Sequence, residues 1–155
     1  MLLPDANERT DHESEVMVLI VEDDPDIAEL LCFALENEQF ITRVARTGEE
    51  GLHASLDEKR PPSVILLDLL LPGMNGLELC RRLRSESLTQ NIPIVILTAK
   101  AFAIDKDKSL SAGADDYITK PFRLRDVILR IRALVDQNRA RIASPKNCLK
   151  LPSTE

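Results

Sequence analysis

The sequence feature that most constrains the fold is a short apolar run that ends in a carboxylate. Residues 64–67 read Val-Ile-Leu-Leu, lie between Pro62 and Pro72, and are followed directly by Asp68. The run is brief and has proline on both sides, so it predicts a strand buried on both faces rather than a helix. An ionised aspartate is almost never fully buried without a partner. Asp68 is therefore expected either to reach a solvated crevice or to cap a turn.

Buried strands alternate with amphipathic helices along most of the chain. Apolar runs predict strands at 16–21, 40–45, 63–68, 92–97 and 116–119. Apolar residues at helical spacing predict helices at about 25–37, 47–56, 75–83, 104–112 and from 124 onward. Five strands that alternate with five helices predict an α/β fold, in which a parallel sheet is covered by helices on both faces.

Composition indicates one globular domain with short tails. The chain has 155 residues, of which 44% are hydrophobic and 30% charged, enough for a substantial core. We expect an acidic tail at 1–15, one domain at 16–140, and a linker or tail at 141–155. The cysteines Cys32, Cys80 and Cys148 form no CxxC motif, so we expect packing roles for the first two rather than redox or metal chemistry.

Charge and hydropathy suggest where the chain acts. The net charge is −6 and the isoelectric point is about 5.0, from which we expect no direct contact of this chain with nucleic acid. No apolar run approaches the roughly 18 residues of a membrane span. The amino terminus lacks the basic-then-apolar pattern of a signal peptide. We therefore expect a cytoplasmic protein with no membrane partner.

Polar side chains follow four of the five predicted strands. Glu22 and Asp23 end the first strand, Asp68 the third, Thr98 the fourth and Lys120 the fifth. The carboxyl ends of parallel strands share one edge of a sheet, and ligands bind there where the strand order reverses. Turn capping alone predicts scattered small polar residues. Three carboxylates, a hydroxyl and an ammonium at one edge instead predict a functional site.

The residue types at this edge suggest phosphoryl chemistry with a metal ion. Glu22, Asp23 and Asp68 would repel one another unless a cation lay between them. Hard oxygen ligands suit Mg²⁺, which commonly takes one or two carboxylates together with phosphate oxygens. A carboxylate beside Mg²⁺ can attack phosphorus and form an aspartyl phosphate. Lys120 could offset charge on the phosphoryl oxygens, and Thr98 could donate a hydrogen bond to one of them.

The ordered motifs resemble the receiver domain of two-component response regulators. The resemblance covers about residues 16–137, with every motif in sequence. The motifs are Val21-Glu22-Asp23-Asp24, Leu67-Asp68, Pro72-Gly73-Met74-Asn75-Gly76, Leu97-Thr98-Ala99 and residues 112–122 (Ala-Gly-Ala-Asp-Asp-Tyr-Ile-Thr-Lys-Pro-Phe). This likeness implies a flavodoxin-like (CheY-like) doubly wound sheet of five parallel strands in the order 2-1-3-4-5, with five helices.

The resemblance also implies roles at the site. Asp68 would be the phosphoacceptor, Asp23 a direct Mg²⁺ ligand, and Glu22 an acidic partner that acts mainly through water. The backbone carbonyl of Leu70 is the expected third protein ligand of the metal. Phosphoryl groups would come from a sensor histidine kinase or a phosphotransfer protein. The chain would then be a phosphoacceptor that catalyses its own phosphotransfer and dephosphorylation, rather than an enzyme with a separate substrate.

Three further residues match the family's switching apparatus. Lys120 corresponds to its phosphate-binding lysine, and the bond from Lys120 to Pro121 is expected to be cis. Thr98 and Tyr117 match its switch pair, in which the hydroxyl moves toward the phosphoryl group and the ring fills the vacated space. This movement would repack the face formed by the fourth helix, the last strand and the last helix.

Charged residues on that face suggest a dimer. A phosphorylation-dependent homodimer would pair opposite charges across a two-fold axis. A simple solvated face explains the same charges equally well. The residues concerned are Lys106, Asp115, Asp116, Asp126 and Arg130.

Several alternatives stay open at this point. The stretch after the last helix is too short for an output domain, so the receiver could be a stand-alone relay or adaptor, or the amino-terminal half of a transcriptional regulator. A haloacid-dehalogenase-like phosphatase also uses an aspartate nucleophile, but it requires a second aspartate where this chain has Leu70. A flavin or nucleotide carrier would need a phosphate-binding loop after the first strand, where residues 22–24 are all acidic.

Overall fold

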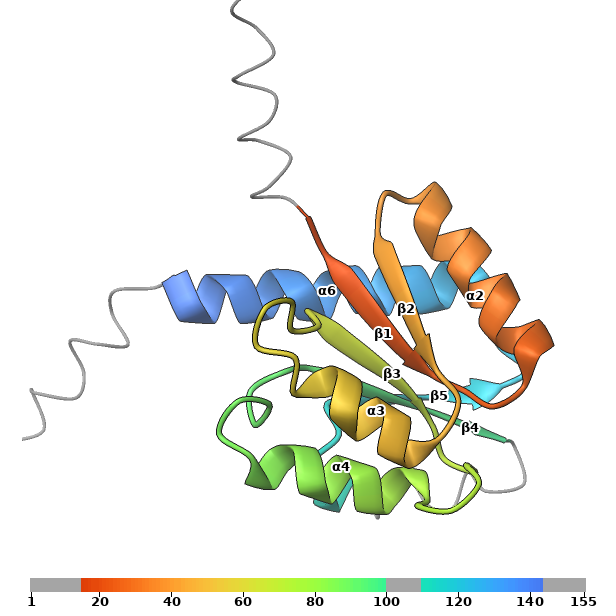
Figure 1. The fold of residues 1–155 in the computed structure, drawn as a ribbon. Helices are drawn as coiled ribbons and strands as arrows, with labels where there is room; N and C mark the ends of the chain where they lie inside the picture. Colours follow the sequence, from red (N-terminus) through yellow and green to blue (C-terminus); the bar gives the residue numbers. More distant parts are fainter. Residues whose placement is uncertain (1–14, 100–109, 144–155) are drawn as a thin grey trace, which may run out of the picture.

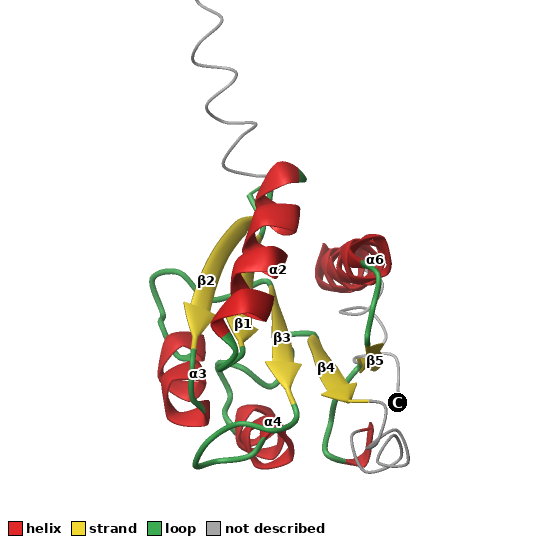
Figure 2. Cartoon of the chain, turned by 90° about the vertical axis from the view of Figure 1, so that its right-hand side faces the viewer, coloured by secondary structure: helices red, strands yellow, loops and turns green. Residues whose placement is uncertain are grey.

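A five-stranded parallel sheet forms the centre of the molecule, with helices against both of its faces (Figures 1 and 2). The computed structural model describes residues 15–99 and 110–143. The strands are β1 (Met17–Val21), β2 (Ile41–Ala45), β3 (Val64–Asp68), β4 (Ile94–Ala99) and β5 (Asp116–Lys120). Their order in the sheet is β2-β1-β3-β4-β5, and every neighbouring pair is parallel. The predicted fold class is confirmed.

The described helices are α2 (Pro25–Asn37), α3 (Gly48–Ser55), α4 (Gly76–Ser85) and α6 (Leu124–Ala143). The helix expected at 104–112 lies largely outside the described residues. Gly113 follows it with φ of +112°, the left-handed conformation expected of a glycine at a helix end. The Lys120–Pro121 peptide bond is cis, as the family resemblance implied. Among the described helices, none is long and apolar enough to cross a membrane.

Local sequence explains where three helices begin. The side chains of Asp24, Thr47 and Asn75 accept hydrogen bonds from backbone N–H groups two or three residues further on, at 2.9, 3.1 and 2.9 Å. Such residues are preferred at helix amino termini because they satisfy N–H groups that have no partner within the helix. Pro25 follows Asp24 in the first turn of α2, where its missing N–H costs nothing.

The sheet separates two hydrophobic clusters. Side chains of α3 and α4 pack on one face, and those of α2 and α6 pack on the other. Strands β1 and β3 are buried along their whole length, which explains their continuous apolar sequences. Cys80 is buried in α4, where burial raises the pKa of its thiol to about 11, and Cys32 is half-buried in α2. Both cysteines therefore have the packing positions expected of them.

The strand order places its reversal between β1 and β3. The chain leaves β1 to form β2 on one side and then returns to form β3 on the other. Val21 pairs with Leu67, so Glu22, directly after β1, and Asp68, the last residue of β3, emerge next to each other. The fold thus builds a crevice edge from the two acidic segments.

Truncation of Leu66 to alanine should destabilise the protein strongly. Leu66 is fully buried in β3, and loss of a buried leucine side chain costs about 2–5 kcal/mol of unfolding free energy. Leu30 offers a matched control, because it is 48% exposed on α2 and its truncation should cost less than about 1 kcal/mol. Urea unfolding of the two variants measures the difference. Equal losses would contradict this description of the core.

Candidate functional site

Three carboxylates meet at the carboxyl edge of β1 and β3. Glu22, Asp23 and Asp68 each offer an oxygen atom, and these atoms lie within 4.8 Å of one another. Asp23 is exposed, whereas Glu22 and Asp68 are only 1% and 6% exposed. The sequence predicted this cluster, and the structure brings its three members together. An all-oxygen donor set with one solvent-facing member suits a hard divalent cation that keeps part of its water shell.

Burial makes the charge of Glu22 costly. Desolvation raises the pKa of Glu22 from its ordinary value near 4.5 to about 7, and the negative charge of Asp68 adds to the rise. The backbone N–H of Asp24, 3.1 Å from Glu22 Oε2, and the ammonium of Lys120 counteract part of this shift in pKa. The crowded carboxylates therefore favour a proton or a cation between them.

Lys120 lies between the two buried carboxylates. Its Nζ is 3.3 Å from Glu22 Oε1 and 3.4 Å from Asp68 Oδ1. Lys120 is the last residue of β5. Its side chain is 21% exposed, so its ammonium lies in a partly solvated site. The backbone N–H of Leu70 also donates to Asp68 Oδ1, at 3.3 Å. Asp68 thus lies next to an ammonium and a backbone donor at the end of a buried strand.

The two predicted switch residues lie on neighbouring strands, β4 and β5, at different depths. Thr98 is buried near the end of β4, and its hydroxyl donates to the carbonyl oxygen of Ala99 at 3.3 Å. Tyr117 is half-buried on β5 and packs against the cluster that α3 and α4 form with the sheet. Their coupled movement stays a prediction, as does the role of the Leu70 carbonyl as a metal ligand.

Sequence reasoning did not single out the close approach of α4 to the backbone of Asp68. A Cβ atom on Gly76 would lie 2.5 Å from the backbone oxygen of Asp68, so only glycine fits there. The N–H of Gly76 donates to the carbonyl oxygen of Leu69 at 2.9 Å. A glycine directly after the helix cap Asn75 was the available signal, but what it contacts depends on the tertiary structure.

The charges predicted for a dimer face have partners within the chain. Asp115 pairs with Arg84 at 2.8 Å, and Asp116 pairs with Arg130 at 3.0 Å. Asp126 is exposed on α6, and Lys106 lies outside the described residues. Asp115, Asp116 and Arg130 are therefore engaged by intramolecular contacts that the sequence analysis did not anticipate.

Comparison with known proteins identifies the family. The family model for the response regulator receiver domain matches residues 18–132. The chain belongs to this family. Receiver structures also share its fold: that of a CheY-like receiver domain protein from Methanospirillum hungatei JF-1 has a TM-score of 0.76 and 32% identity, covering 83% of this chain and 99% of that chain.

A second receiver structure is described with a metal ion. The receiver domain of sensor histidine kinase PA1611 from Pseudomonas aeruginosa PAO1 has a TM-score of 0.72 and 25% identity, covering 79% of this receiver and 99% of that chain. Its description places a magnesium ion in the active site cleft. The acidic cluster of Glu22, Asp23 and Asp68 offers the type of ligands that such an ion requires.

One sequence relative corrects an expectation. The DNA-binding response regulator MtrA of Mycolicibacterium smegmatis is 44% identical over 121 residues, which cover 78% of this receiver and 51% of MtrA. The expectation of no direct contact with nucleic acid is therefore wrong as an inference from net charge. The net charge refers to this chain alone, which spans only about half the length of the curated relatives it matches. It therefore does not decide whether the chain has a nucleic-acid partner.

Substitution of Glu22 by glutamine should change how stability depends on pH. Because folding raises the pKa of Glu22, the folded protein binds a proton that the unfolded chain has lost, and the free energy of unfolding falls between about pH 4.5 and 7. Without divalent cations, Glu22→Gln should remove roughly 1–3 kcal/mol of this fall, since one pKa unit corresponds to about 1.4 kcal/mol.

Urea unfolding at several pH values, as the difference between variant and wild type, measures this effect. Asp57→Asn is a control, because Asp57 lies away from the site and its pKa is lowered by the backbone N–H of Lys59. Parallel curves for Glu22→Gln and wild type would contradict the raised pKa.

Proposed function

We propose that this receiver accepts a phosphoryl group on Asp68 from a histidine kinase or a phosphotransfer protein. The observation that carries the proposal is a buried carboxylate at the sheet's switch point, 3.4 Å from a lysine ammonium and clustered with two more carboxylates. The acidic neighbours of Asp68 are suited to hold a divalent cation. The ammonium of Lys120 is suited to offset the charge of a phosphoryl group on Asp68.

The proposed phosphoryl transfer is a direct displacement at the phosphorus atom. A carboxylate oxygen of Asp68 attacks the phosphorus of a phosphohistidine and forms a P–O bond while the P–N bond breaks. The bond's electron pair passes to the imidazole nitrogen, and the product is an aspartyl phosphate. The added group carries about −1.5 to −2 charges, which the ammonium of Lys120 would offset from the β5 side.

The acidic cluster would hold Mg²⁺ during this reaction. Glu22, Asp23 and Asp68 would supply oxygens to the ion, which would offset the charge of the carboxylates and the phosphoryl group. Attack of water on the aspartyl phosphate would later return Asp68 and release inorganic phosphate. In this proposal the chain acts on its own side chain and on no separate substrate.

Substitution of Asp68 by asparagine should abolish phosphorylation. The amide lacks the anionic oxygen that attacks phosphorus, while its size is nearly unchanged. With acetyl phosphate and Mg²⁺, the wild type should acquire an acid-stable, hydroxylamine-labile label that disappears in the variant. Asp126→Asn is a matched control on exposed α6 and should label like the wild type. Equal labelling of Asp68→Asn would show that the acceptor lies elsewhere.

We infer that the phosphoryl switch serves the control of transcription. The support is the 44% identity to a relative whose name describes a DNA-binding response regulator. Replacement of the gene by its Asp68→Asn version in the source cell should change transcript levels in the same set of genes as deletion. Unchanged transcripts, in cells where labelling of the protein is lost, would contradict a role in transcription and favour a relay to another protein.

A further inference from the structure

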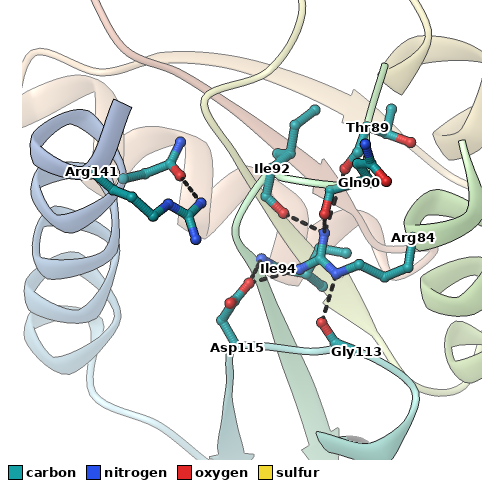
Figure 3. A network of polar contacts seen from close by, with 9 residues as sticks. Arg84, Thr89, Gln90, Ile92, Ile94, Gly113, Asp115 and Arg141 are labelled. Carbon is teal, nitrogen blue, oxygen red and sulfur yellow. Dashed lines mark hydrogen bonds and ion pairs between the residues drawn. The ribbon is translucent and has the colours of Figure 1, made fainter. Parts of the chain in front are cut away.

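Arg84 joins the end of α4 to the loop that follows it and to a turn about 30 residues further along the chain (Figure 3). It sits in the last turn of α4, and its side chain is 21% exposed. Its guanidinium donates to the carbonyl oxygens of Gly113 at 2.8 Å and Ile92 at 2.7 Å, and to a carboxylate oxygen of Asp115 at 2.8 Å. The carbonyl oxygens of Thr89 and Gln90 accept two longer bonds, at 3.4 and 3.1 Å. A rigid fork of donors thereby fixes the loop before β4 and the turn before β5 to one helix.

Asp115 connects this guanidinium to the pairing of β4 with β5. Its Oδ2 atom accepts a second hydrogen bond, from the backbone N–H of Ile94 at 2.8 Å. Its own N–H donates to the carbonyl oxygen of Ile94 at 2.9 Å. The first residue of β4 is therefore bound twice by the residue that precedes β5, and Arg84 holds the carboxylate that makes one of these bonds.

The register of β5 matters because its last residue reaches the site. Among the described strands β5 lies at the edge of the sheet and pairs only with β4, and Ala99 lies opposite Lys120. Side chains alternate between the faces of a sheet, so a slip of one residue would turn every side chain of the strand to the other face. Such a slip would take Lys120 away from Asp68, which it now approaches at 3.4 Å.

A second arginine holds the opposite face of β5, but it does so in a more exposed position. Arg130 of α6 donates to the carboxylate of Asp116 at 3.0 Å and to the carbonyl oxygen of Tyr117 at 2.8 Å. Its side chain is 45% exposed, compared with 21% for Arg84. Both ion pairs have an exposed partner and contribute little by themselves, so the additional short bonds of Arg84 to the carbonyl oxygens of Gly113 and Ile92 make it the expected main anchor of the start of β5.

The other end of α4 lies against the phosphoacceptor. Gly76 begins the helix and approaches the backbone of Asp68 as closely as only glycine can. The start of α4 thus contacts β3, the strand that carries Asp68. The end of α4 is bonded through Arg84 to the turn that leads into β5, the strand that carries Lys120.

We propose that Arg84 is a positioning residue for phosphoryl chemistry: it holds β5 in register so that the Lys120 ammonium stays beside Asp68. This proposal rests on the proposed function of the site. It assigns to α4 the task of setting the distance between the acceptor carboxylate and the cation that offsets phosphate charge. Arg84 makes no hydrogen bond to Glu22, Asp23, Asp68 or Lys120, so any effect on the site is indirect, and the proposal assigns it to the position of Lys120.

The test compares Mg²⁺ affinity with beryllofluoride affinity in Arg84→Gln. Glu22 and Asp23 directly follow β1 and Asp68 ends β3, and the hydrogen bonds of Arg84 reach neither strand, so Mg²⁺ affinity should stay within about twofold of wild type. Affinity for beryllofluoride, the phosphoryl stand-in, should fall by about tenfold, the low end of the effect of removing an outer partner of a functional group. Hydrogen exchange of the β5 amides should quicken, while that of β1 stays unchanged.

Two further variants make the test specific. Arg84→Lys keeps the charge near Asp115 but cannot reach all the acceptors of the fork, so its beryllofluoride affinity should fall between those of wild type and Arg84→Gln. Arg84→Lys also serves as the test variant if Arg84→Gln does not fold. Arg82→Gln is the matched control, since Arg82 lies on the same helix, is 54% exposed and pairs only loosely with Glu78 at 3.7 Å. Arg82→Gln should match wild type in both affinities.

A double-mutant cycle decides whether Arg84 acts through Lys120. In a Lys120→Ala background, Arg84→Gln should cause no further loss of beryllofluoride affinity, because the cation that it positions is gone. Additive losses, or Mg²⁺ and beryllofluoride affinities that fall together, would overturn the proposal. If Asp68→Asn still bound beryllofluoride, the proposed function itself would fail. If Asp68→Asn lost binding while the Arg84 variants matched wild type, only the positioning role would fail.

Discussion

The structure depends on how two buried carboxylates are kept at one edge of the sheet. Glu22 directly follows β1, Asp68 ends the neighbouring strand β3, and both are almost wholly removed from solvent, so burial and the charge of Asp68 raise the pKa of Glu22. Lys120 lies within 3.4 Å of both and partly offsets that cost. Under the proposed function this unfavourable arrangement has a chemical use, because a divalent cation and a phosphoryl group would together replace the missing solvation.

The surrounding scaffold keeps these charges in place. β1 and β3 are buried along their full length, so packing on both faces fixes where their last residues emerge. Lys120 comes from the edge strand β5, which has one neighbouring strand and fewer buried side chains. The hydrogen bonds of Arg84 tie down the turn at the start of β5. Under the proposal made above, three carboxylates fixed by packing are thus combined with a cation whose position depends on a polar network.

Much of the fold and most of the acidic site could be predicted from the sequence, for identifiable reasons. The burial of strands and the period of helices are local patterns, and the caps Asp24, Thr47 and Asn75 act within three residues. Side chains at the carboxyl ends of parallel strands share one edge of the sheet, so the sequence predicted that the acidic residues lie close together. Net charge was a poor guide to partners, since it could not anticipate a relative whose name describes DNA binding.

The sequence by itself determined the alternation of elements, the strand ends that bear charge and the chemical types at the site. Only the tertiary structure decided which charges pair. Arg84 and Asp115 are 31 residues apart, and they meet because α4 packs across the sheet where β4 and β5 begin. The same packing gives Asp115 and Asp116 separate arginines on opposite faces of the sheet. Ion pairs between distant elements depend on register and helix placement, which local sequence patterns do not encode.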